Sequence, residues 1–179
     1  MQRKKWRLPE HSFICLYVGR ISIEKNLDIL SNVSQTGKEV LLVLAGRGPY
    51  LNILRGKIPF IHLGEHKHDK LGEIYRLADC FIFPSKTETF GNVILEALSS
   101  GLPIICDEKY VNSRVITEEK IGLMYHNHQS LIDSIVRFKS DSLLYNQIKE
   151  RAIFYSSKFS WERSVIELKS IYSKLLNNN

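Results

Sequence analysis

SKTETFGNVILEALSSGLP, from Ser85 to Pro103, joins the end of an apolar run to an amphipathic segment and then to a stop signal. The apolar run ends at Pro84, which cannot donate to a strand ladder, so we expect a buried strand to finish there. Apolar side chains then recur at helical spacing and predict a helix over 91–100. Gly101 and the proline two residues later end that helix.

The predicted helix has a polar line that carries a carboxylate. Asn92 and Glu96 lie four residues apart, on the side away from the apolar stripe, so Glu96 is directed away from the core. At the helix start, Phe90, Gly91 and Asn92 present backbone N–H groups that no helical turn satisfies. The small Gly91 lets an anion approach closely, so the sequence predicts a phosphate site there.

The whole chain alternates apolar strand-like runs with helical patterns. Runs that are apolar from end to end indicate strands covered on both faces, and alternation with helices indicates parallel pairing through right-handed crossovers. The predicted fold class is therefore α/β, a Rossmann-like, doubly wound parallel sheet. The expected strands are 13–18, 40–45, 60–63, 80–83, 102–106 and 122–125, and the expected helices are 24–33, 49–55, 69–78, 91–100, 113–117, 130–139 and 141–156.

A last helix is expected after residue 158. Ser160 is suited to cap it, and Glu162 or Arg163 opens it. We expect three parts: a basic start or interdomain junction at 1–12, the Rossmann-like domain at 13–158, and a C-terminal helix at 159–179.

Composition places the chain among globular proteins. Of its 179 residues, 44% are apolar and 10% are aromatic, which is enough to bury a core. No apolar run reaches the roughly 18 residues of a membrane span, and no signal-peptide pattern is present, so we expect a soluble, cytoplasmic protein. The three cysteines, Cys15, Cys80 and Cys106, lie in strand-like runs and are predicted to be buried free thiols.

The net charge is +6, and most of this positive charge comes from the first seven residues, MQRKKWR. Such a basic segment has two interpretations. It is a solvated terminus or linker, which we favour, or it makes a peripheral contact with anionic lipid at the inner face of the membrane. Nucleic-acid binding is not expected, because the cations are neither interleaved with aromatic residues nor gathered on one helix.

Ligands of doubly wound sheets bind at the carboxyl ends of the strands, and that rule selects four loops. Gly19 and Arg20 follow the first strand, with Lys25 six residues after the glycine. Gly46 begins the turn after the second strand, Gly64 follows the third, and Glu88 follows the fourth. Cations and N–H groups suit phosphate and carboxylates suit hydroxyls, so these loops predict a site for a nucleoside diphosphate joined to a hydroxyl-rich group.

These motifs resemble the donor-binding, C-terminal half of family 4 glycosyltransferases of the GT-B fold. The resemblance covers about 13–176 and closes on the segment 159–162, FSWE. It rests on the following motifs in the family's order: Gly19-Arg20 with Lys25, Gly46-x-Gly48-Pro49, Leu63-Gly64, Pro84-Ser85, Glu88-x-Phe90-Gly91 through Glu96-Ala97, and Ser100-Gly101-Leu102-Pro103-Ile104.

The resemblance implies a role for each matching residue. Arg20 and Lys25 bind the diphosphate and neutralise the leaving group, and Glu88 contacts the sugar. Glu96 accepts hydrogen bonds from the ribose. The remaining implied donor contacts are backbone groups of Gly19, Gly46, Leu63, Gly64, Phe90, Gly91 and Asn92.

The resemblance also implies a reaction. Such enzymes transfer a hexosyl group from a nucleotide diphosphate sugar to a glycan, a lipid-linked or a similar hydroxyl acceptor, with retention and without a metal ion. We expect no cofactor, a UDP-sugar donor rather than a GDP-sugar, and departure of the phosphate from the front face rather than Glu88 acting as a covalent nucleophile. The alternative is a non-catalytic module that binds nucleotide sugars or assembles with a partner.

Three departures from the family pattern bear on this hypothesis. Arg47 stands where an acid is common; it either adds phosphate affinity or faces solvent, and we favour solvent. The segment 107–114, DEKYVNSR, replaces a loop that often has paired glycines and a glutamate. The GT-B fold has two Rossmann-like domains, whereas this chain has room for one. The N-terminal acceptor domain is therefore an expected partner, and little transfer is expected without it.

Two further patterns have plainer interpretations. The His66-x-His68 and His126-x-His128 pairs lack cysteine or carboxylate partners, so we expect solvated histidines rather than a metal site. Trp6 and Trp161 are expected to be packing anchors rather than sugar platforms.

Overall fold

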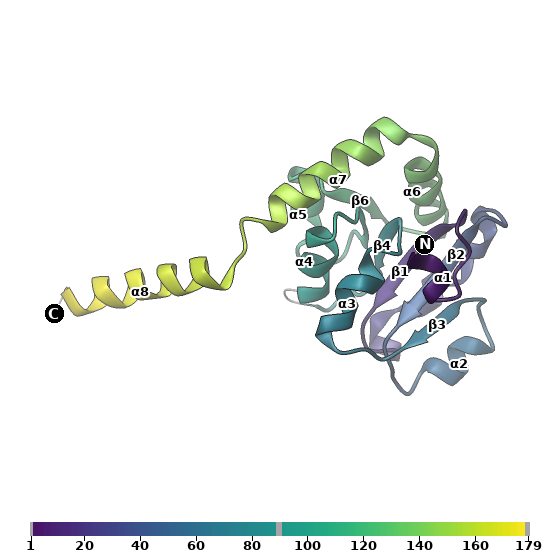
Figure 1. The fold of residues 1–179 in the computed structure, drawn as a ribbon, viewed down its shortest axis with the longest axis horizontal. Helices are drawn as coiled ribbons and strands as arrows, with labels where there is room; N and C mark the ends of the chain where they lie inside the picture. Colours follow the sequence, from purple (N-terminus) through teal and green to yellow (C-terminus); the bar gives the residue numbers. More distant parts are fainter. Residues whose placement is uncertain (1, 89–90, 178–179) are drawn as a thin grey trace.

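The computed structural model describes residues 2–88 and 91–177, and these form one six-stranded parallel sheet with helices on both faces (Figure 1). The strand order is β3-β2-β1-β4-β5-β6, so the direction of winding reverses between β1 and β4. The sequence prediction of a doubly wound sheet is confirmed. The strands are β1 (Phe13–Val18), β2 (Val40–Ala45), β3 (Ile61–Gly64), β4 (Cys80–Phe83), β5 (Ile104–Asp107) and β6 (Gly122–Tyr125).

Alternate side chains of the central strands enter two separate cores. Leu16 and Phe81 belong to one core and Cys15 and Cys80 to the other, which is the period of two expected for a strand. The first core lies under α3 (His68–Tyr75), α4 (Asn92–Ser99) and α5 (Ser113–Glu118). The second lies under α2 (Leu51–Arg55) and α6 (His128–Ser140), and α7 (Ser142–Ser156) contributes to both.

Helix α4 forms as its sequence predicts. Ile94, Ala97 and Leu98 are buried against the sheet, whereas Asn92 is exposed. Gly101, just beyond the helix, has a φ of 75°, the left-handed conformation that commonly ends a helix. The stop signal quoted above is therefore confirmed.

The helix predicted over 24–33 is instead two 3₁₀ segments, η1 (Ile23–Lys25) and η2 (Leu27–Thr36). Asn26 separates them in a left-handed conformation with a φ of 55°. The buried side chains of η2, Leu27, Leu30 and Val33, recur every third residue, which suits a helix with about three residues per turn. The segment is therefore helical as predicted, but it is a pair of 3₁₀ segments rather than one continuous helix.

The two ends of the chain behave differently. The short helix α1 (Gln2–Lys5) is fixed by Arg3, which donates to the carbonyl of Leu77 at 2.9 Å and forms an ion pair with Asp79 at 2.8 Å. Helix α8 (Trp161–Asn177) projects away from the sheet (Figure 1). Hydroxyl Oγ of Ser160 accepts from the N–H of Arg163 at 3.2 Å, which confirms the predicted cap.

Helix α8 leaves its apolar side chains uncovered. Trp161 is 86% exposed, so the expectation that it packs as an anchor is wrong. Trp6 does pack: it is partly buried against the first core and meets the ring of His66 edge-on at 5.1 Å. The other exposed apolar side chains of α8 are Val165, Ile166, Leu168, Ile171, Tyr172, Leu175 and Leu176.

The cysteine prediction is confirmed. All three thiols are free and buried, and the sulfurs of Cys15 and Cys80 lie 3.6 Å apart on neighbouring strands. Burial, with Cys15 beside it, raises the pKa of Cys80 well above its ordinary value. Across residues 2–88 and 91–177, every helix is too short or too polar to cross a bilayer.

Candidate functional site

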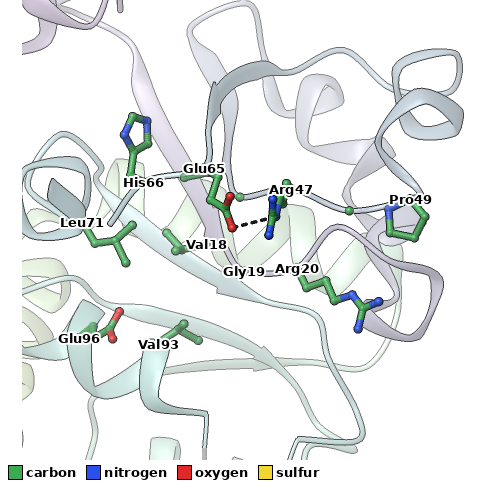
Figure 2. Close-up of a pocket in the computed structure, with 13 residues that line it drawn as sticks. Val18, Gly19, Arg20, Arg47, Pro49, Glu65, His66, Leu71, Val93 and Glu96 are labelled. Atoms are coloured by element: carbon green, nitrogen blue, oxygen red, sulfur yellow. Dashed lines mark ion pairs between the residues drawn. The ribbon is translucent and has the colours of Figure 1, made fainter. Parts of the chain in front are cut away.

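A cavity of about 740 Å³ opens at the carboxyl ends of β1, β2 and β3, beside α4 (Figure 2). This edge of the sheet, next to the reversal of winding between β1 and β4, is where doubly wound folds bind ligands. The cavity is lined by Val18, Gly19, Arg20, Ala45, Gly46, Arg47, Gly48, Pro49, Glu65, His66, Leu71, Val93 and Glu96. Four of the predicted site residues are among them: Gly19, Arg20, Gly46 and Glu96.

Backbone hydrogen bonds join the loops around the cavity. The N–H of Gly46 donates to the carbonyl of Gly64 at 2.7 Å, and the N–H of Gly19 donates to the carbonyl of Ala45 at 3.0 Å. Gly46 has a φ of 137°, and a Cβ at this position would overlap the carbonyl oxygen of Gly19. Glycine is therefore required where these two loops meet.

The backbone at Leu63 and Gly64 is already engaged. The carbonyl of Leu63 accepts from Nε2 of His66 at 2.7 Å, and the carbonyl of Gly64 accepts from Gly46. The following residues, Glu65 and His66, line the cavity in their place. A carbonyl oxygen has a second lone pair, so a ligand contact at this strand end remains compatible with these bonds.

Arg20 is an exposed cation whose backbone is fixed. The hydroxyl of buried Tyr17 donates to the carbonyl of Arg20 at 2.7 Å. Burial, and then the charges of Glu88 and Glu24, raise the pKa of Tyr17, so this hydroxyl stays protonated and keeps donating. Figure 2 shows Arg20 at the end of the cavity opposite Glu96.

Lys25 and Glu88 form an ion pair that bridges the loops after β1 and β4. Their side chains are only 17% and 34% exposed, so water screens this pair less than a surface pair. The two residues are brought together at the reversal of winding but are not part of the cavity lining. The sequence assigned them to the same site without predicting that they contact each other.

Glu96 belongs to the cavity and also to a neighbouring groove of about 380 Å³. Its Oε2 accepts a hydrogen bond of 2.8 Å from the hydroxyl of Tyr75, and its Oε1 lies 3.4 Å from Nδ1 of His68. The side chain is 24% exposed. The groove is otherwise lined by His68, Asn92, Leu95, Phe159, Ser160, Trp161 and Ser164.

The start of α4 is open to solvent on its described side. Gly91 has a φ of 61°, and its carbonyl accepts from the N–H of Ile94 at 2.7 Å. Within the described part of the chain, no side chain caps this end. Asn92 is exposed there, whereas Phe90, also predicted as a contact, lies outside the described residues.

Glu65 was missed as a site residue, and for Arg47 the solvent-facing alternative was favoured. Nε of Arg47 lies 3.0 Å from Oε1 of Glu65, and Figure 2 shows this pair joining the loops after β2 and β3 at the cavity. Arg47 is 78% exposed, as the sequence suggested, yet it lines the cavity. Glu65 was detectable in principle, because it directly follows the predicted strand end at Gly64.

Metal ligation has no support among the side chains of residues 2–88 and 91–177, where no three His, Cys, Asp or Glu residues gather closely enough to hold an ion. His66 and His128 have other neighbours: Leu63 and Asn32, respectively.

Comparison with known proteins assigns the chain to a family. Residues 1–153 match the family described as glycosyl transferases group 1. The chain belongs to this family. It is 30% identical over 173 residues to a sulfoquinovosyl transferase from Arabidopsis thaliana, covering 90% of this chain and 33% of that protein. The first relatives are matched over about a third to a half of their length.

Solved structures share the fold, among them one described as a group 1 glycosyl transferase. The chain superposes on the C-terminal domain of such a protein from Francisella tularensis with a TM-score of 0.71 at 18% identity, covering 88% of this chain and 90% of that domain. It also superposes on HepE from Anabaena, solved in complex with UDP-glucose, with a TM-score of 0.83 at 20% identity, covering 99% and 51%. The chain therefore has the fold of the C-terminal half of a GT-B glycosyltransferase, as the motifs indicated.

Proposed function

We propose that this chain is the half of a retaining glycosyltransferase that binds the nucleotide-sugar donor. The observation that carries the proposal is the arrangement at one edge of the sheet. A cation, Arg20, and a carboxylate, Glu96, face the same cavity, and the Lys25–Glu88 pair lies at the neighbouring strand ends. Cations suit a diphosphate and carboxylates suit sugar hydroxyls.

In the proposed reaction, a hexosyl group moves from a nucleotide diphosphate sugar to a hydroxyl of a glycan, lipid-linked or similar acceptor. Breaking the glycosyl–phosphate bond leaves negative charge on the departing diphosphate. Arg20 and Lys25 stabilise that charge, and their effect is larger in the transition state than in the bound donor. The open start of α4, with Gly91 and Asn92, adds N–H groups to the same task.

Donor binding is proposed to include an exchange of the partner of Lys25, which pairs with Glu88 in this structure. Without an anion nearby, Glu88 neutralises Lys25. A diphosphate brings more negative charge than one carboxylate, so it competes for the ammonium group and releases Glu88 toward the sugar. We propose that this exchange prepares both residues for the reaction.

The donor is proposed to be a UDP-sugar in preference to a GDP-sugar. The likeness to HepE, whose structure holds UDP-glucose, supports this choice. The backbone at Leu63 and Gly64, together with His66, is the proposed environment of the base, because these residues end β3 beside the cavity.

The acceptor is proposed to be bound by a separate N-terminal domain. We propose residues 1–12 as the junction with it and 159–179 as a helix that runs back toward it. The uncovered apolar side chains of α8 support the second assignment. Any peripheral contact with anionic lipid is proposed to rest chiefly on Arg7, since Lys5 forms an ion pair with Glu73 at 2.9 Å, Lys4 with Glu10 at 3.9 Å and Arg3 with Asp79 at 2.8 Å.

The test is titration of the chain with UDP, GDP and ADP at fixed salt, followed by amide chemical shifts. We expect one nucleotide to shift signals near Gly19, Gly64 and Gly91. The variant Arg20→Ala should lose about tenfold in affinity, the size of one charge-assisted hydrogen bond. Arg151→Ala, which removes an exposed arginine from α7, is the matched control and should bind like the parent chain.

Two results would count against the proposal. Equal binding of all three nucleotides with no effect of Arg20→Ala would mean that the cavity is not a donor site. Selective binding without any transfer after an N-terminal acceptor domain is supplied would favour the alternative, a non-catalytic nucleotide-sugar module.

A further inference from the structure

Glu96 has a buried partner that no sequence motif indicates. Tyr75, the last residue of α3, is 1% exposed, and its ring packs edge-on against Phe81 at a centroid distance of 5.9 Å. Its hydroxyl donates to Oε2 of Glu96 at 2.8 Å. The tyrosine hydroxyl that donates this hydrogen bond is therefore held in place by the core. A water molecule or a flexible surface side chain in its place would leave the carboxylate free to turn.

The direction of this hydrogen bond is fixed. Burial, and then the charge of Glu96, raise the pKa of Tyr75, so the hydroxyl remains protonated and the carboxylate accepts. The tyrosine is neutral, so Glu96 keeps its full negative charge. Each carboxylate oxygen can accept two hydrogen bonds, so Oε1 keeps capacity for a ligand hydroxyl even with His68 3.4 Å away.

We infer that Tyr75 is a positioning residue for recognition of the donor's ribose. It holds Oε2 of Glu96 and thereby presents Oε1 to the ribose hydroxyls of a bound nucleotide. The inference rests on the proposed function, in which carboxylates meet hydroxyls of the donor, and on the ribose contact that the family resemblance implies for Glu96. The reason for an effect is preorganisation: a glutamate that is already ordered loses less rotamer freedom when the ligand binds.

The test compares ribose-containing and ribose-deficient ligands. The 179-residue chain and its Tyr75→Phe variant are titrated by calorimetry with UDP and GDP, each beside its 2′,3′-dideoxy counterpart. The parent chain should prefer a ribonucleotide about tenfold, since the dideoxy ligand lacks the hydroxyls that Glu96 accepts from. In Tyr75→Phe the preference should fall to about threefold or less, while affinity for the dideoxy ligand stays within about a factor of two.

Tyr145→Phe is the matched control. The hydroxyl of Tyr145 donates to the carbonyl of Asp79 at 2.9 Å, just before β4 begins and thus at the opposite edge of the sheet from the cavity. This variant also loses a hydrogen bond from a tyrosine packed on the sheet, but it should keep the parent's ribose preference. A Glu96→Gln variant should lose the preference, because it removes the charged acceptor.

The outcomes separate the inference from the proposed function. If Glu96→Gln loses the ribose preference and Tyr75→Phe keeps it, the positioning role is wrong and the proposed function stands. If Tyr75→Phe lowers the affinity for the ribonucleotide and for the dideoxy ligand equally, the tyrosine is only structural and the inference is again wrong. If the parent chain binds no ribonucleotide, or binds both ligands alike, the ribose role of Glu96 fails and the role of Tyr75 fails with it.

Discussion

Glu88 and Glu96, with seven residues between them, are held in opposite ways. Glu88 forms an ion pair with Lys25, whereas Glu96 accepts a hydrogen bond from the neutral hydroxyl of Tyr75. The first carboxylate is neutralised and the second keeps its charge. Two glutamates of one sequence motif thus have different electrostatic surroundings, set by the elements packed against them.

The difference follows from where each partner originates. Lys25 comes from η1, in the loop after β1, so the Lys25–Glu88 pair spans the reversal of winding, where a ligand is expected. Tyr75 is the last residue of α3, and its side chain is buried in the first core. An ionic contact in a binding crevice can be exchanged for a ligand, whereas a hydrogen bond from the core is retained. Glu88 is accordingly the movable carboxylate and Glu96 the fixed one.

The largest expected effect is on ligand binding in Lys25→Ala. The variant loses a phosphate contact and leaves Glu88 unneutralised beside the diphosphate, so affinity for the preferred nucleoside diphosphate should fall about 100-fold. Glu88→Gln should bind that ligand a few-fold more tightly, since it frees Lys25 and removes an anion. Calorimetry at one fixed salt concentration measures both.

A double variant sharpens this prediction. Lys25→Ala combined with Glu88→Gln should recover about tenfold of the lost affinity, because the repulsion is removed, although the phosphate contact of Lys25 is still missing. Simple addition of the two single effects would give a different value, so the coupling is measurable. Weaker binding by Glu88→Gln alone would contradict the view that the ion pair competes with the ligand.

The second prediction concerns stability. Glu96→Ala leaves the buried hydroxyl of Tyr75 without its acceptor and should lower the free energy of unfolding by about 2 kcal/mol. Glu88→Ala should cost less than about 1 kcal/mol, because the partly exposed Lys25 can turn to water. Urea denaturation of both variants measures the difference.

The control for this prediction uses the tyrosine. In a Tyr75→Phe background, Glu96→Ala should cost less than in the parent chain, since no hydroxyl is then left without an acceptor. Equal losses in the two backgrounds would show that the hydrogen bond contributes nothing to folding. Equal losses for Glu88→Ala and Glu96→Ala would remove the distinction between the two carboxylates.

Most of the fold was predictable because the strands are apolar from end to end. The predicted strands 13–18, 40–45, 80–83 and 122–125 have the bounds of β1, β2, β4 and β6, and the other two strands differ by two residues or fewer at each end. The helix type at 24–33 was not predictable in the same way. A spacing of three between Leu27, Leu30 and Val33 fits both helix types, and the local pattern does not indicate the left-handed Asn26 that divides the segment.

The site was predictable only as a set of loops. Glycines, cations and acids at successive strand ends indicated where a ligand would bind. The partners within the site were not visible, because Lys25 and Glu88 are 63 residues apart and Tyr75 and Glu96 are 21 apart. Such contacts depend on how helices pack on the sheet, and local periodicity carries no information about them. Helix α8 is a further example. The sequence predicted that this segment is a helix, but it did not predict that the apolar side chains of the helix are exposed.

The smallest effect is expected at a third carboxylate, Glu65, which lines the cavity together with Glu96. Its partner Arg47 is 78% exposed and Glu65 itself 54% exposed, so water and salt screen the pair. Arg47→Ala should therefore change the free energy of unfolding by less than about 0.5 kcal/mol, and raising the salt concentration to about 0.5 M should abolish even that difference. A loss as large as that of Glu96→Ala would mean that burial does not rank these three carboxylates. A small loss would agree with the order Glu65, Glu88, Glu96 of increasing shielding from water. The first two carboxylates have a cation as partner, and the last has a core hydroxyl.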